Sequence, residues 1–211
     1  ARINLGTNKM IFGNNASGNT LTAPNGTGFL PSGKFSRWWT TTATGSAVTA
    51  NADPTTTTSR YPFIAANGDS RAMYISRTNA TAAVAGELAV TYNDATSITQ
   101  NLSVSDAGYQ ITERFNGNWL VSNEGTSVSS SSYRIVLIAQ NALATSNGNV
   151  RVMNANAPLG GNHQSGTSTP GAQRINVSQT DLLAAPLYIG INSSDLPFIS
   201  IASGNWNSPG N

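Results

Sequence analysis

Short runs of β-branched and aromatic residues, separated by clusters of Gly, Asn, Asp and Ser, most restrict the fold of this chain. Within the runs apolar residues recur at every second position, as at Leu88, Val90 and Tyr92, and no long segment has the 3.6-residue period of a helix. This pattern predicts about ten or more short strands. The expected strands lie within residues 2–12, 34–41, 61–63, 72–77, 87–92, 98–104, 109–115, 119–121, 133–140, 150–153, 175–177, 187–191 and 198–201.

Many short strands without a blade-like repeat favour a β-sandwich over a propeller. We therefore predict an all-β fold, a sandwich of short, mostly antiparallel strands joined by long loops. Residues 34–201 are expected to form the sandwich, residues 1–33 to supply N-terminal strands at a junction with a preceding module or subunit, and residues 202–211 to link to a next module.

Four local features refine this prediction. Asn116-Gly117 is the strongest hairpin signal in the sequence. Residues 133–140 are apolar on both faces, as in a central strand covered on both sides. Residues 158–171, which contain the only histidine, are expected to form a long loop, and Ser178 is a suitable N-cap for one helical turn.

Composition limits the classes of function. Only 9% of the residues are charged and the net charge is +2, so no basic stripe is available to follow a nucleic acid backbone. No apolar run approaches the roughly 20 residues that span a bilayer. Lys9 and Lys34 are the only lysines, although Lys is a common protection of exposed strand edges. Either the edges are covered, or the chain associates with itself.

The sequence provides no recognisable catalytic constellation. Cysteine is absent, which rules out disulfides and thiolate metal sites. The single histidine, His163, lies in an expected loop, and the nine acidic residues show no spacing that selects a catalytic pair. Glu113, on the apolar face of its strand, is expected to be paired, with an Arg as one candidate partner. We therefore predict that the protein is not an enzyme.

Aromatic side chains are the candidate binding residues. Trp38, Trp39, Tyr61 and Trp119 could stack on sugar rings, although large aromatics also supply core area to a sandwich. Alternation along residues 34–41 places Trp38 and Trp39 on opposite faces, so one of them is expected in the core and the other at least partly on a surface.

No cofactor is expected, with calcium as an open alternative. Asp69 and Asp94 lie in turns rich in Asn, Gly and Ser, where carboxylates and carbonyl oxygens are the usual calcium ligands. The same turns favour Asp for backbone reasons alone.

Four phrases of the first half resemble segments of large, multi-domain surface and secreted proteins of Bacteroidota that are exported by the type IX system. They read LGTNKMIFG at residues 5–13, GTGFLPSGKFSR at 26–37, YPFIAANGDSR at 61–71 and GELAVTY at 86–92. The final GNWNSPG, residues 204–210, resembles the opening of a next module. The resemblance implies an extracellular or cell-surface modular protein of which this chain is one unit.

The sequence as a whole favours a non-enzymatic structural or adhesive module of a bacterial extracellular protein, with assembly into a fibre or filament as a further hypothesis. Its expected partners are other copies or adjacent modules of the same protein. The alternative is a carbohydrate-binding module that holds surface glycans through its exposed aromatics. Neither nucleic acid nor membrane insertion is expected.

Overall fold

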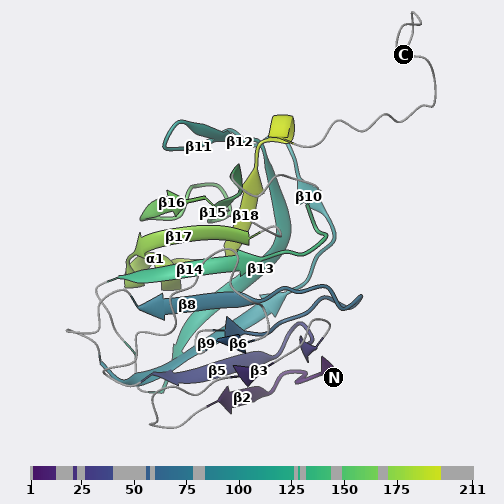
Figure 1. Cartoon of the computed structure of the whole chain (residues 1–211), viewed down its shortest axis with the longest axis vertical. Helices are drawn as coiled ribbons and strands as arrows, with labels where there is room; N and C mark the ends of the chain where they lie inside the picture. The colour runs from purple at the N-terminus through teal and green to yellow at the C-terminus, as the bar shows by residue number, and fades with distance from the viewer. Residues whose placement is uncertain are drawn as a thin grey trace, which may run out of the picture.

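The computed structural model describes residues 2–12, 21–22, 27–39, 56–57, 60–77, 84–125, 128, 132–143, 149–165 and 171–195. It has the predicted all-β architecture, in which two main, largely antiparallel sheets pack together (Figure 1). The strand expected at residues 198–201 and the linker expected at residues 202–211 lie outside the described residues.

The larger sheet has the strand order β15-β18-β13-β9-β5-β2, with β10 also paired to β13. Its pairs are antiparallel except β2 with β5, which run parallel. The strands are β2 Lys9–Phe12, β5 Lys34–Trp39, β9 Gly86–Asn93, β10 Ile98–Thr99, β13 Glu113–Glu124, β15 Arg151–Met153 and β18 Leu187–Ile191.

The smaller sheet has the order β16-β17-β14-β8-β7, and all its pairs are antiparallel. Its central strand is β14, as the apolar residues 133–140 predict. The strands are β7 Arg60–Tyr61, β8 Met73–Arg77, β14 Tyr133–Ile138, β16 Asn162–Gln164 and β17 Gly171–Val177.

Three strand pairs and two short helices complete the described fold. Strand β1 (Arg2–Ile3) runs parallel to β4 (Gly28–Phe29), and β11 (Val104–Asp106) forms a hairpin with β12 (Tyr109–Ile111). The remaining elements are β3 (Leu21–Thr22) with β6 (Thr56–Thr57), helix α1 (Gln179–Ala184) and a 3₁₀ helix (Ser193–Asp195).

The main core lies between the two sheets because each strand turns alternate side chains inward. Phe35 and Val90 of the larger sheet belong to one buried cluster with Ile75 and Ile135 of the smaller sheet. Phe35 is also stacked on Phe29, with ring centroids 4.7 Å apart. Residues 1–33 thus contribute β2 to the larger sheet and Phe29 to the core.

Strand β14 is buried on both faces. Val136 and Ile138 alternate with the core residues of that strand and form a second buried cluster with Ala72 and Tyr74 of the same sheet. A third cluster lies under the β11–β12 hairpin, where Val104, Ile111 and Met153 pack together. Burial on both faces explains why the 133–140 run has no polar stripe.

The hairpin predicted at Asn116-Gly117 is wrong. Strand β13 continues through both residues, with a shift of register against β18 between Phe115 and Trp119. The two-residue turn of this region is instead Ala107-Gly108, where both residues have positive φ, 51° and 87°. Such a pair of angles is the type I′ geometry that two-residue hairpins require.

The long loop predicted for residues 158–171 is also wrong in part. Residues 162–164 form the edge strand β16, which pairs with β17, so His163 lies in a strand and is half-buried. The predicted helical turn is confirmed as α1, and the Ser178 side chain caps it by accepting a hydrogen bond from the Asp181 N–H.

Candidate functional site

Three of the four aromatic binding candidates lie in the core. Trp39, Tyr61 and Trp119 are 3%, 0% and 0% exposed. The Trp39 indole N–H donates to the Tyr61 hydroxyl (3.2 Å), which donates to the Leu88 carbonyl (3.1 Å), and the Trp119 indole donates to the Arg71 carbonyl (2.7 Å). Rings enclosed by the core in this way expose no face on which a glycan could stack.

Trp38 points to the opposite face of β5 and is half-buried. Lys34 shares that face, and the salt-bridged carboxylate of Glu87 lies across from Trp38 on β9. The structure therefore brings Trp39 and Tyr61 together in the core and separates both from Trp38.

Salt bridges cover the outer face of the larger sheet beside Trp38. Lys9 Nζ lies 2.7 Å from Glu87 Oε1 and 3.7 Å from Glu124 Oε2, and Lys34 Nζ lies 2.6 Å from Glu124 Oε1. The hydrogen bond from Lys34 lowers the pKa of Glu124. These contacts reach past the adjacent strand: Lys9 on β2 meets Glu87 on β9, and Lys34 on β5 meets Glu124 on β13.

The two calcium candidates accept hydrogen bonds from nearby side chains. The Asp69 carboxylate accepts from the amides of Asn67 (2.8 Å) and Asn141 (3.0 Å), and Asp94 accepts from the Tyr92 hydroxyl (2.7 Å). Within the described residues no group of three or more His, Asp or Glu could hold a metal ion. The Asp69 carboxylate thus connects its own turn with the distant Asn141, and Asp94 holds the hydroxyl of Tyr92.

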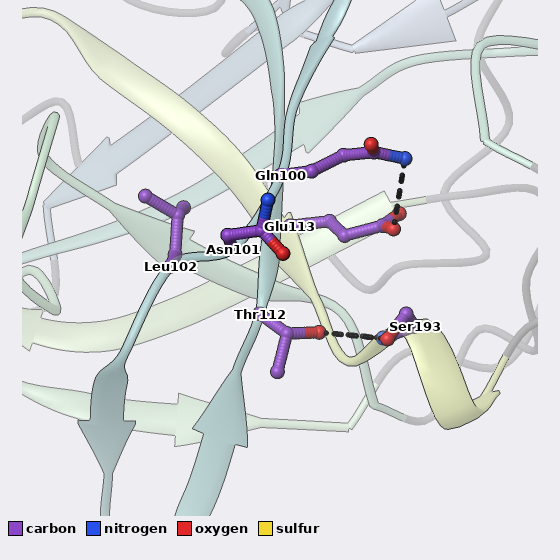
Figure 2. A pocket seen from close by; sticks show the side chains of 6 residues that line it. All are labelled: Gln100, Asn101, Leu102, Thr112, Glu113 and Ser193. Atoms are coloured by element: carbon purple, nitrogen blue, oxygen red, sulfur yellow. Dashed lines mark hydrogen bonds between the residues drawn. The ribbon is translucent and has the colours of Figure 1, made fainter.

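A polar pocket lies at the other end of the larger sheet from β2. Its volume is about 400 Å³, and Figure 2 shows the side chains that line it. The described lining residues come from the segment after β10, from the start of β13 and from the 3₁₀ helix: Gln100, Asn101, Leu102, Thr112, Glu113 and Ser193.

Strand pairing places two of these side chains opposite each other. Ile98 pairs with Phe115 and Thr99 with Arg114, so the next position brings Gln100 across from Glu113. The Gln100 amide donates to Glu113 Oε1 at 3.4 Å, as Figure 2 shows. On the same side of the pocket, the Ser193 N–H donates to Thr112 Oγ1 at 2.8 Å.

Glu113 is the most unusual of these residues, because it is only 7% exposed. The arginine partner expected from the sequence is absent: no described basic side chain forms a salt bridge with Glu113. The adjacent Arg114 points to the other face of the strand, where its guanidinium lies 4.4 Å from the centre of the Tyr188 ring. Glu113 therefore has a neutral amide as its partner.

A buried ion cluster that the sequence analysis missed ties the β11–β12 hairpin to both sheets. The Arg174 guanidinium donates to both oxygens of Asp106 (2.7 and 3.1 Å), and Arg151 Nε lies 3.4 Å from the same carboxylate. Asp106 and Arg174 are 5% and 3% exposed. No spacing in the sequence marks this cluster, because its members lie on three strands.

These observations define an all-β sandwich with a polar pocket and a buried ion cluster. No helix among the described residues is long and apolar enough to cross a membrane. Comparisons with protein-family models, with curated proteins and with solved structures found no significant match.

Proposed function

We propose that this chain is a non-enzymatic structural and adhesive module of a bacterial extracellular protein, and that it associates with a second copy of itself through strand β2. One observation carries the proposal: β2 is an edge strand that exposes two consecutive large apolar side chains, Met10 and Ile11. Met10 is 40% and Ile11 51% exposed. Backbone groups along such an edge are a template for pairing with another chain.

The other sheet edges are protected or short. The outer side of β15 is occupied where Leu159 N–H donates to the Val152 carbonyl (3.3 Å). Strand β7 has two residues and is followed by Pro62, and β16 has three residues, all polar. Strands β1 and β10 are also edges and each exposes one large apolar residue, Ile3 and Ile98, but each has only two residues; among the described strands β2 alone is an edge with two such residues.

Symmetry supports a second copy as the occupant of this edge. A two-fold axis perpendicular to the sheet and midway between the two edge strands, level with Ile11, would pair Ile11 with Ile11 of the second copy. Met10 would then lie opposite Phe12 of the second copy, on the face that carries the core. Apolar side chains meet apolar side chains along this register, and both larger sheets become one continuous sheet.

This contact forms a dimer. An isologous two-fold interface closes on itself, so a fibre requires a second contact elsewhere on the molecule. The low charge of the chain and the four phrases shared in style with modular surface proteins support the extracellular setting.

The test is sedimentation velocity over a range of protein concentrations, with a matched pair of variants. Ile11→Lys introduces a charge on the edge strand, whereas Leu120→Lys introduces one at a 39% exposed position in the interior of the same sheet. We expect a dimer for the wild type and for Leu120→Lys, and a monomer for Ile11→Lys with unchanged circular dichroism. A wild type that stays monomeric at every concentration, or a dimer that survives Ile11→Lys, would overturn the proposal.

A further inference from the structure

The pocket around Glu113 contains a carboxylate whose hydrogen-bonding capacity is not used. An ionised carboxylate can accept about four hydrogen bonds. Glu113 Oε1 accepts one long bond from Gln100, and Oε2 has no hydrogen-bond partner among the described residues. Figure 2 shows the side chain projecting into the pocket beside Gln100. Glu113 as a residue is only 7% exposed, and its carboxylate faces the pocket, where a further donor would stabilise it.

The lining residues beside Glu113 offer oxygen atoms. Gln100, Asn101 and Thr112 each bear a side-chain oxygen that can accept a hydrogen bond. Figure 2 shows that Leu102 projects away from Glu113, and its side chain packs against the buried cluster of Val104, Ile111 and Met153. Glu113 is the only charged residue among the described lining residues, so the pocket presents a single negative charge.

We infer that this pocket binds the ammonium group of an amine, with its N–H donors against Glu113. An ammonium has three N–H donors and no acceptor, which matches one carboxylate surrounded by neutral oxygens. Its positive charge supplies the pairing that buried carboxylates ordinarily have. The same chemistry is presented by a free amine and by the side chain of a lysine on another protein.

Two other ligand classes fit less well. Calcium takes six to eight oxygen ligands, usually with several carboxylates, and the described lining residues provide one carboxylate. A sugar would be expected to stack on an aromatic ring, and no aromatic residue lines the described part of the pocket. The single negative charge of Glu113 therefore decides which class of ligand fits the pocket, and it favours a cation with N–H donors.

The inference is independent of the proposed dimer, because none of the described residues that line the pocket belongs to β2 or to β5, the strand paired with it. The experiment records the backbone amide NMR signals of the whole chain during separate titrations with n-butylammonium chloride, n-butanol, glucose and calcium chloride. We expect n-butylammonium alone to shift the signals of Asn101, Thr112 and Glu113 in a saturable manner. A lysine-containing peptide titrated in parallel distinguishes the protein-borne source from the free amine.

Matched variants test whether n-butylammonium binding depends on Glu113. Glu113→Gln keeps the size of the side chain and removes its charge, and it is expected to weaken n-butylammonium binding about tenfold or more, the loss of one charge-assisted hydrogen bond. Gln110→Ala, at an exposed glutamine outside the pocket, should leave binding unchanged. Binding that persists in Glu113→Gln, shifts caused by glucose or calcium instead, or no response to any probe would each overturn the inference.

Discussion

The ring of Phe115 lies against Gly117, two residues further along strand β13. A Cβ atom at Gly117 would meet Phe115 Cε1 at 2.3 Å and the Tyr92 hydroxyl at 2.7 Å, closer than nonbonded carbon atoms approach. Gly117 is thus required by packing inside a strand, and this explains why an Asn-Gly pair that usually marks a hairpin does not turn the chain here.

Replacement of Gly117 by Ala should destabilise the fold by about 1–3 kcal/mol, the range for overpacking in a filled core. The free energy of unfolding from urea denaturation measures the effect. Leu120→Ala, on an exposed position of the same strand, should change it by about 0.5 kcal/mol or less. A Gly117→Ala variant as stable as the wild type would show that the Phe115 ring moves aside without cost.

Asp106 and Glu124 each contact two basic side chains, but Asp106 is buried and Glu124 lies at the surface. Their replacement should therefore lower the free energy of unfolding by very different amounts. Asp106→Ala leaves Arg174 and Arg151 without their buried counter-charge and should cost about 3–5 kcal/mol. Glu124→Ala removes the partner of Lys9 and Lys34 at the surface and should cost about 1 kcal/mol or less. Equal losses of unfolding free energy in the two variants would contradict this assignment.

Stability should decline at alkaline pH. Burial raises the pKa of Tyr133 to about 12 and also raises the pKa values of Tyr61 and Tyr92. An unfolded tyrosine has a pKa of about 10. The protonated, buried tyrosines therefore contribute their full stabilisation below about pH 10. This stabilisation is lost as the pH rises toward about 12, because the unfolded chain releases protons that the folded chain retains.

Urea midpoints measured at successive pH values test this decline, and tyrosinate absorbance reports the ionisation itself. Tyr133→Phe removes one of the buried phenols and should make the decline less steep. A midpoint that does not change between about pH 9 and 12 would be inconsistent with buried, protonated tyrosines.

The adjacent tryptophans should differ in their effect on stability. Trp39→Ala opens a cavity in the core and should cost about 3–5 kcal/mol, whereas Trp38→Ala removes a half-buried ring and should cost about 1 kcal/mol. Thermal and urea unfolding of the two variants provide the comparison. A larger loss for Trp38→Ala than for Trp39→Ala would reverse the assignment of core and surface.

The alternative function, glycan binding by stacked aromatics, now depends on Trp38, because the other three candidates are enclosed. A glycan array with the wild type and Trp38→Ala tests it. We expect no glycan to lose binding in the variant. A glycan retained by the wild type and lost by Trp38→Ala would restore that alternative.

The local sequence pattern was sufficient to predict several elements of the fold. The alternation of Leu88, Val90 and Tyr92 identified β9, the apolar run at residues 133–140 identified a central strand, and Ser178 identified the start of α1. These predictions succeed because each depends on the period of one strand or on one cap, which neighbouring residues determine. The opposite faces of Trp38 and Trp39 followed from the same period.

Contacts between distant segments decided the features that the local pattern did not predict. Phe115 and Tyr92 fill the space over Gly117 and override its turn preference, and Asp106 meets Arg174 across 68 positions of the chain. Glu113 gained Gln100 as its partner, in place of an arginine, because β10 pairs with the start of β13. The sequence by itself determined the class of fold and the inward faces of its strands, since side-chain alternation is local. Only the tertiary structure decided which edge stays open and which carboxylate faces a pocket, since both depend on strand pairing and register across the whole sheet.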